Sequence, residues 1–184
     1  KCREVGDSQM SALFGMHARM TCVSKTLERS AEIAHALDTG FHVHAAEDEI
    51  DARLTMERYG RKIMDRFQDF GIPGEKTVFA HGSHLDSYEM DLLKSTNSML
   101  VNNPESNMNN GLKVSPILDF LKHGVLTGVG TDGMSSHLIS QARAMYLHQR
   151  ALPRDPTIPL REACPLLPAN HRSLTNRLIH ESPR

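Results

Sequence analysis

The sequence predicts an α/β fold made of repeated strand–helix units, the pattern of a (β/α)8 barrel. Short apolar stretches alternate along the chain with longer stretches in which apolar residues recur at helical spacing. Several of the apolar stretches end in polar residues of the types that catalysis uses. Because the loops after the carboxyl ends of barrel strands build active sites, we expect these polar residues to meet at one mouth.

Five apolar stretches are predicted to be strands. In the stretch that begins at Phe41, Phe41 and Val43 alternate with His42 and His44, which is typical of a strand with two different faces. The other predicted strands are 12–16, 77–80, 98–101 and 126–129. The spacing from one strand to the next suits one crossover helix, as parallel pairing requires.

The stretches between the strands are predicted to be helices. Ser24 is predicted to cap the first helix, and Gly60 to break the second into two pieces. A later helix has Ser115 as its expected N-cap and Pro116 at its first position. Residues 102–111 contain five Asn, a proline and a glycine, so we expect irregular backbone there. The predicted helices are one from Ser24 to the residue before Gly40, and 48–70, 88–94, 116–123, 137–150 and 160–179, the last with breaks at Pro165 and Pro168.

Composition indicates an ordinary globular domain. The chain has 184 residues, of which 39% are hydrophobic and 23% charged, with a formal net charge of -1. That balance gives no reason to expect a nucleic acid or an anionic membrane as partner. No apolar run approaches the ~20 residues of a membrane span.

Three cysteines, an odd number without metal-motif spacing, favour a cytoplasmic location. Because the chain begins at Lys1 and not at methionine, we expect it to be part of a longer protein.

Polar residues that could hold a metal follow four of the predicted strands. They are His44 with Glu47, then His81, then the pair 102–103, and then Asp132. Neutral imidazole is a common metal ligand, and a nearby carboxylate can move protons for a metal-bound water. An aspartate held between glycines at a strand end can bind a metal and accept a proton from its water.

Four short motifs resemble the amidohydrolase superfamily, in the branch that includes guanine deaminase, methylthioadenosine and adenosylhomocysteine deaminase, and the triazine hydrolases. They are His-Ala-Ala-Glu at 44–47, Ala-His-Gly at 80–82, Asn-Pro-Glu-Ser-Asn at 103–107 and Gly-Thr-Asp-Gly at 130–133. The stretches 102–110 and 14–18 are most similar to the SsnA-type aminohydrolases of that branch. The resemblance runs from about Phe14 to Arg177.

The resemblance implies a role for each strand-end residue. His44 matches a metal-binding histidine, and Glu47 matches the glutamate that carries a proton from the metal-bound water to the leaving group. His81 matches a histidine that polarises the group under attack or, in some members, touches the metal. Asp132 matches an aspartate that binds the metal and acts as a base. The implied cofactor is one divalent metal, zinc first and iron as the alternative.

Two further residues are predicted to contact the substrate. His17 lies where relatives place a substrate-contacting histidine, and its neighbour Arg19 is less typical there and bears on specificity. His42 is predicted to point away from the metal and to be structural. The resemblance makes the Phe41 strand the fifth of the barrel, so the chain would hold strands four to eight and lack the His-x-His of the first.

The resemblance also predicts the arrangement of the whole protein. Residues 1–151 would be the carboxyl-terminal part of the barrel, about five of its eight units. Residues 152–184 would be a linker and a helical segment that leads toward a small β domain. We expect a homodimer that acts on a small molecule.

Three functions follow as hypotheses. The first is a metal-dependent aminohydrolase, or deaminase, that removes nitrogen from a heterocyclic or amidine-like carbon. The second is the same fold acting on an amide or on another leaving group. The third is a catalytically incomplete barrel fragment that folds only by association.

Overall fold

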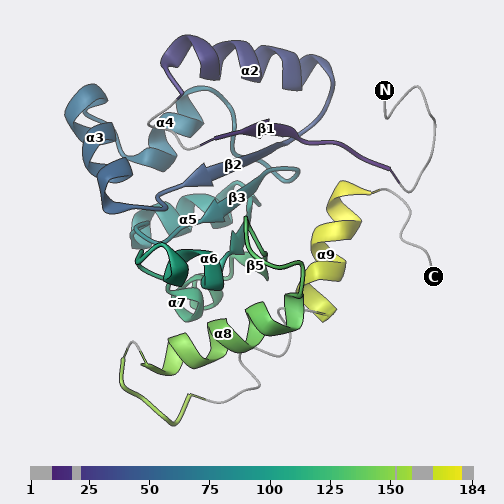
Figure 1. The fold of residues 1–184 in the computed structure, drawn as a ribbon. Coiled ribbons are helices and arrows are strands. Elements are labelled where there is room, and N and C mark those ends of the chain that lie inside the picture. Colours follow the sequence, from purple (N-terminus) through teal and green to yellow (C-terminus); the bar gives the residue numbers. More distant parts are fainter. Residues whose placement is uncertain (1–9, 18–21, 152, 159–167, 180–184) are drawn as a thin grey trace.

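The computed structural model of the chain describes residues 10–17, 22–151, 153–158 and 168–179, and it contains one parallel sheet (Figure 1). The sheet has five strands in the order β1-β2-β3-β4-β5. They are β1 (Phe14–Met16), β2 (Phe41–Ala45), β3 (Val78–His81), β4 (Met99–Asn102) and β5 (Leu126–Val129). Each strand pairs in parallel with the next one in the sequence. All their carboxyl ends therefore lie along one edge.

Helices connect the strands, as parallel pairing requires. The connecting helices are α2 (Ser24–Ala36), α3 (Glu49–Tyr59), α4 (Ile63–Asp69), α5 (Ser87–Ser95), α6 (Pro104–Asn109) and α7 (Ile117–Lys122). Two more helices, α8 (Leu138–Ala151) and α9 (Pro168–Leu178), follow β5. Local sequence explains several ends. The side chain of Asp86 accepts from the backbone N–H of Glu89 in a capping box that starts α5. Gly60 ends α3 with a φ of 61°, a left-handed conformation that costs glycine little.

Apolar side chains lie on both faces of the sheet, because successive side chains of a strand point to opposite faces. Phe41 and Phe79 are on the face that packs against the connecting helices in the larger core cluster. Val78 and Met99 are on the other face, where they pack with Leu174 of α9. The helix residues of the larger cluster include Leu27, Ala31, Ile63, Met64, Phe67, Leu93, Ile117, Phe120 and Met145.

Helix α9 lies beside β5 (Figure 1, yellow). Among the described residues, β5 pairs with a strand only on its β4 side. On its other side, the side chain of Asn170 donates to the backbone carbonyl of Thr127 at 2.7 Å. The backbone N–H of Val129 donates to Nε2 of His171 at 3.1 Å. Side chains of α9 therefore bind backbone groups at the open edge of the sheet.

The predicted order of strands and helices is confirmed over the described residues, including the break at Gly60. Of the helix predicted at 160–179, α9 covers Pro168–Leu178, and the part before it, with the predicted break at Pro165, lies outside the described residues. The prediction of irregular backbone at 102–111 is wrong, because α6 occupies 104–109. Pro104 stands at the first helical position, where a missing N–H costs nothing, so this proline starts a helix.

Two predicted caps are also wrong. Val23 is the N-cap residue of α2, and Ser24 is already helical, with its hydroxyl accepting from Arg66 at 2.7 Å. Pro116 is the N-cap residue of α7, while the hydroxyl of Ser115 donates to the backbone carbonyl of His81. Both hydroxyls are used by residues far away in the sequence, which a local capping rule does not consider.

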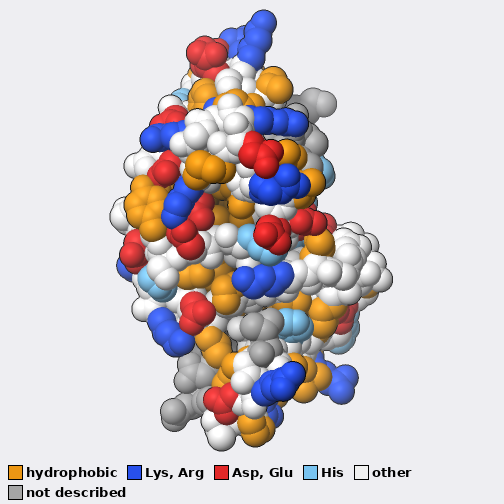
Figure 2. Space-filling view, turned by 90° about the vertical axis from the view of Figure 1, so that its left-hand side faces the viewer, with side chains coloured by type: hydrophobic (Ala, Val, Ile, Leu, Met, Phe, Trp, Pro, Cys, Tyr) orange, Lys and Arg blue, Asp and Glu red, His pale blue; other side chains and the backbone are white. Residues whose placement is uncertain are grey.

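Charges of both signs are interspersed on the face drawn in Figure 2. Exposed ion pairs on α3 and near α4 include Arg53–Glu57, Arg61–Asp69 and Lys62–Asp86. The described residues on this face form no uniform basic surface of the kind that binds nucleic acids. None of the helices in the described ranges is long and apolar enough to cross a membrane.

Candidate active site

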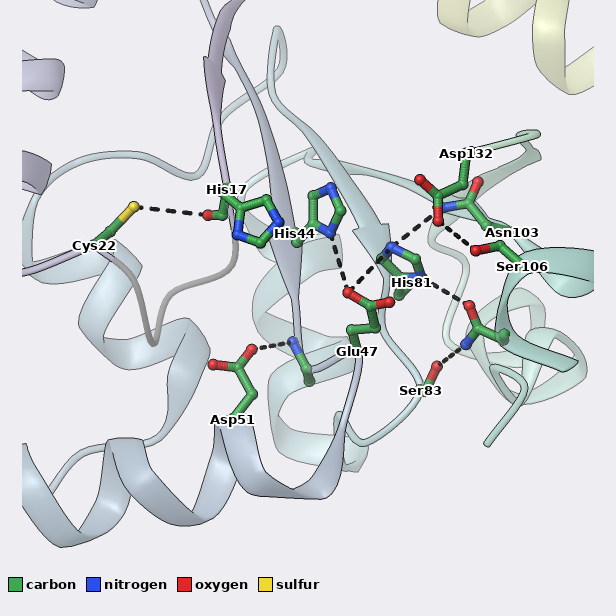
Figure 3. Close-up of polar contacts among 12 residues, drawn as sticks. His17, Cys22, His44, Glu47, Asp51, His81, Ser83, Asn103, Ser106 and Asp132 are labelled. Atoms are coloured by element: carbon green, nitrogen blue, oxygen red, sulfur yellow. Dashed lines mark hydrogen bonds and ion pairs between the residues drawn. The ribbon is translucent and has the colours of Figure 1, made fainter. Parts of the chain in front are cut away.

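Four of the predicted site residues gather at the carboxyl edge of the sheet (Figure 3). His17 follows β1, His44 lies in β2, His81 ends β3 and Asp132 follows β5. The ring centres of His17 and His44 are 5.1 Å apart, and those of His44 and His81 are 4.8 Å apart. The sheet topology thus forms a row of three imidazoles, because parallel strands end at the same edge.

Glu47 is brought back over this row by a turn after β2. Ala46, with a φ of 50°, starts the turn, and its backbone N–H donates to Oδ2 of Asp51 at 3.2 Å. Asp51 is 1% exposed in the first turn of α3, so the turn is anchored in the protein interior. As a result, Oε2 of Glu47 lies 3.2 Å from Nδ1 of His44 and 3.7 Å from Nε2 of His81.

The donor set of this cluster fits a divalent metal. One ligand atom from each of His44, Glu47 and His81 lies within 4.8 Å of the other two. Imidazole nitrogen and carboxylate oxygen are ligands that zinc accepts, and they also suit iron. Three such groups at the mouth of a sheet, partly or fully buried, can hold one ion between them.

Asp132 lies beside this cluster and is held separately. It has a φ of 49°, and Oδ2 of its carboxylate accepts from the hydroxyl of Ser106 at 2.5 Å. Its negative charge is one of the effects that raise the pKa of His44, and it also opposes the lowering of the pKa of His81 by burial. The hydrogen bond from Ser106 restrains the carboxylate near the two histidines.

His81 is completely buried and is held by several polar contacts. Its Nδ1 lies 2.8 Å from Oδ1 of Asn107, and its Nε2 lies 3.4 Å from Nδ2 of Asn103. Ser115 donates to the backbone carbonyl of His81. The φ of His81 is 72°, a backbone conformation that residues other than glycine rarely adopt. These contacts fix both the backbone and the ring at the end of β3.

The cluster shifts the pKa of each of its members. A hydrogen bond to Glu47 raises the pKa of His44, and the same bond lowers the pKa of Glu47. Burial lowers the pKa of His81, which favours the neutral ring that metal binding requires. Burial alone would raise the pKa of Asp132, but hydrogen bonding from Ser106 and the nearby histidines bring it below its ordinary value. Both carboxylates are therefore ionised near neutral pH.

The structure brings together five of the six residues that the sequence singled out for the site. They are His17, His44, Glu47, His81 and Asp132. The sixth, Arg19, lies outside the described residues.

The prediction that His42 points away from the metal is wrong about the face of the sheet on which His42 lies. His42 is two residues before His44 in β2, so its exposed side chain lies on the same face, farther from the carboxyl end.

Sequence reasoning missed the residues that hold these groups in place. They are Asp51, Ser106, Asn107 and Ser115. Ser106 and Asn107 belong to the Asn-Pro-Glu-Ser-Asn motif, which served the resemblance but received no role. The position of this motif after a predicted strand could have placed it near the barrel mouth, because the βα loops build active sites there. That position does not identify the groups that Ser106 and Asn107 contact.

Known families and proteins resemble this chain over most of its length. The model of the Amidohydrolase family matches residues 5–168. A 5-methylthioadenosine/S-adenosylhomocysteine deaminase of Desulfitobacterium hafniense is 33% identical over 72% of this chain and 31% of its own length. A 5'-deoxyadenosine deaminase of Methanobrevibacter smithii is 29% identical over 82% of this chain and 35% of its own length. The chain thus spans about a third of these relatives.

Solved structures share the fold. An adenosine deaminase from Xanthomonas campestris with bound zinc has a TM-score of 0.79 at 22% identity, covering 91% of this chain and 38% of that one. The zinc complex of the atrazine chlorohydrolase TrzN from Arthrobacter aurescens has a TM-score of 0.79 at 19% identity, covering 100% and 44%. The five βα units are accordingly part of a (β/α)8 barrel, as the sequence predicted.

Proposed function

Because this chain belongs to the amidohydrolase family, we propose that the whole protein is a metal-dependent hydrolase that removes an amino group from a heterocyclic or amidine-like carbon. The relatives named above are deaminases of adenosine-type compounds, which supports this class of reaction. The proposal concerns the whole protein, since the chain spans about a third of those relatives.

One observation carries the proposal. The ligand atoms of His44, Glu47 and His81 lie within 4.8 Å of one another at the carboxyl edge of the sheet. A metal at this point would supply Lewis acidity and lower the pKa of a bound water. We infer that His44 and Asp132 hold it, with His81 as the further candidate ligand, and that Glu47, whose Oε2 lies near both imidazoles, is left for proton transfer. Zinc is our first choice, because two neighbouring structures contain it, and iron is the alternative.

The protein's own carboxylates would move the protons. Glu47 is ionised near neutral pH and lies between two imidazoles, so it can accept a proton and return it to the leaving nitrogen. Asp132 is ionised as well and is restrained by Ser106, which suits a base that acts on the attacking water. His17, at the exposed end of the imidazole row, is our candidate for substrate contact, with Arg19 as the second.

The proposed substrate is a purine nucleoside or a purine base. The relatives named above are 5-methylthioadenosine/S-adenosylhomocysteine and 5'-deoxyadenosine deaminases. A guanine deaminase from C. acetobutylicum with bound guanine has a TM-score of 0.72 at 20% identity, covering 86% of this chain and 40% of that one. A second candidate is displacement of another leaving group, such as chloride. The likeness to the atrazine chlorohydrolase favours it.

Several finer features belong to the same proposal. We expect a protein of the SsnA type that works in the cytoplasm as a homodimer. We also expect 152–184 to lead from the barrel toward a small β domain. The third hypothesis, an incomplete barrel that folds by association, stands as the alternative for the chain by itself.

Metal content and ammonia release test the proposal together. Elemental mass spectrometry on the full-length protein should find stoichiometric zinc or iron, and His44→Ala and Asp132→Ala should lose it. His123→Ala is the matched control, because His123 pairs with Asp91 on the surface and lies outside the cluster. Ammonia should be released from 5'-deoxyadenosine, methylthioadenosine or guanine by the wild type and the control only. A metal-free wild type that releases no ammonia would refute the proposal.

A further inference from the structure

Asn107 is a buried residue whose amide group is fully used by three other parts of the chain. It lies in α6 and is 1% exposed. Its Oδ1 lies 2.8 Å from Nδ1 of His81. Its Nδ2 lies 2.8 Å from the hydroxyl of Ser83 and 2.8 Å from the backbone carbonyl of Lys113. A buried side chain whose oxygen and amino group both have partners can impose an orientation on them.

The partners of Asn107 determine which way its amide points. The carbonyl oxygen of Lys113 can only accept a hydrogen bond, so the group that faces it must be the amino group, Nδ2. The group that faces His81 must then be the oxygen, Oδ1, which can only accept. His81 consequently has to donate, and its proton must be on Nδ1.

This assignment determines the chemistry of the other ring nitrogen. In a neutral imidazole with hydrogen on Nδ1, the lone pair is on Nε2. Nε2 of His81 lies 3.7 Å from Oε2 of Glu47 in the candidate site. The amide Nδ2 of Asn103 lies 3.4 Å from the same nitrogen and can donate to its lone pair. Asn103 and Asn107 thus favour the same form of the ring from opposite sides.

We propose that Asn107 is a positioning residue that fixes the tautomer of His81, so that Nε2 faces the site as a lone-pair nitrogen. His81 then binds the metal or accepts a proton, and in its neutral form it cannot donate a hydrogen bond to a substrate oxygen or nitrogen. The role of Nε2 in catalysis rests on the proposed function, whereas the tautomer itself rests only on the hydrogen bonds.

Hydrogen bonds from α8 restrain the first turn of α6. Gln141 of α8 is completely buried, its Oε1 accepts from the backbone N–H of Glu105, and its Nε2 donates to the carboxylate of Glu105. The next two residues of α6 are Ser106, which holds Asp132, and Asn107, which holds His81. Because Gln141 restrains this turn of α6, the turn sets the positions of two site residues, His81 at the end of β3 and Asp132 after β5.

The decisive measurement is the tautomer of His81 in the wild-type protein. Long-range 1H–15N correlation spectra of the full-length protein, treated with a chelator so that a bound metal does not set the tautomer, identify which nitrogen carries hydrogen. We expect Nδ1–H and an unprotonated Nε2 at a pH where the ring is neutral. A neutral His81 with hydrogen on Nε2 would overturn the proposal without any variant.

Variants then show whether Asn107 is the cause. Asn107→Asp keeps an oxygen acceptor toward His81 and should retain the Nδ1–H form. Asn107→Ala removes the acceptor, so the spectra should show both tautomers, and zinc affinity should fall by about 10- to 100-fold. Asn109→Ala is the matched control, because Asn109 is an exposed residue of the same helix whose side chain donates to Asn110 at the surface. An unchanged tautomer in Asn107→Ala would contradict the proposal.

Two results separate this inference from the proposed function. If the wild type shows Nδ1–H but binds no metal and releases no ammonia, the proposed function fails and the tautomer assignment stands. If the protein is an active metalloenzyme whose His81 carries hydrogen on Nε2, the opposite holds. Should Asn107→Ala fail to fold, as judged by circular dichroism, the wild-type spectrum and Asn107→Asp still decide.

Discussion

Nδ1 of His44 lies 3.2 Å from Oε2 of Glu47, three residues later in the chain. The turn that follows β2, anchored by the buried carboxylate of Asp51, brings these two side chains together. The hydrogen bond raises the pKa of the imidazole and lowers that of the carboxyl group. Each partner therefore stabilises the charged form of the other, and a metal bound to His44 must compete with a proton on the same ring.

The first prediction concerns stability against pH in the metal-free protein. The raised pKa of His44 gives stability that is complete below about pH 6.5 and is lost as pH rises through the folded-state value. The lowered pKa of Glu47 gives stability that is complete above about pH 4.3 and is lost as pH falls through its folded-state value. Wild type should exceed Glu47→Gln by about 1 kcal/mol in unfolding free energy between these limits, and by less on either side.

Urea titrations at several pH values measure this difference. Glu49→Gln serves as the control, because Glu49 is an exposed acidic residue of the same segment. A difference between wild type and Glu47→Gln that does not change with pH would mean that the two side chains are not coupled.

The second prediction separates metal binding from turnover. Glu47→Gln keeps the size of the side chain but cannot accept a proton, so ammonia release should fall by about 100- to 10,000-fold. The metal content should stay close to that of the wild type, since His44, His81 and Asp132 remain. Parallel kinetic and elemental measurements check both points, and retained activity would exclude Glu47 as the proton carrier.

The third prediction tests the anchor of the turn. Asp51→Ala removes the acceptor for the backbone N–H of Ala46 in a buried place, which should lower the unfolding free energy by about 1–3 kcal/mol. Asp51→Asn keeps an oxygen acceptor and should cost less. Glu49→Ala is the surface control, and denaturant titration at neutral pH is the measurement. Equal stability of all three variants would show that the contact contributes nothing.

The fourth prediction concerns the close approach before β2. A Cβ atom at Gly40 would lie 2.0 Å from the backbone oxygen of Lys76, which cannot move away as a side chain could. Gly40→Ala should therefore destabilise the protein by about 3 kcal/mol or more. Gly74→Ala is the matched control, because a Cβ atom there meets nothing within 4 Å. Thermal unfolding of both variants tests the prediction, and similar midpoints would refute it.

Much of the fold could be predicted because its signals are local. An apolar stretch such as 126–129 between polar loops is visible in the sequence, and so is the glycine at position 60 that ends α3. Helix α6 was missed for the opposite reason. Its composition suggests a loop, and only the position of Pro104 directly after a strand favours a helix start.

The candidate site also has parts that could be predicted from the sequence and parts that could not. The resemblance to amidohydrolases is confirmed, and it pointed to His44, Glu47, His81 and Asp132 as the residues to look for. The supporting contacts could not be predicted, because they join elements that are distant in the sequence. Asn107 is 26 positions from His81, and Ser106 is 26 positions from Asp132. No periodicity or capping rule relates such pairs.

Helix α9 has a consequence for how this chain, taken by itself, stays dispersed in solution. An uncovered strand edge is a template on which strands of other molecules can add, and such addition leads to aggregates. Asn170 and His171 each bind one backbone group of β5 at that edge, and Leu174 packs against apolar residues of the sheet beside it. A chain shortened before Pro168 should therefore precipitate at concentrations that the chain ending after Leu178 tolerates.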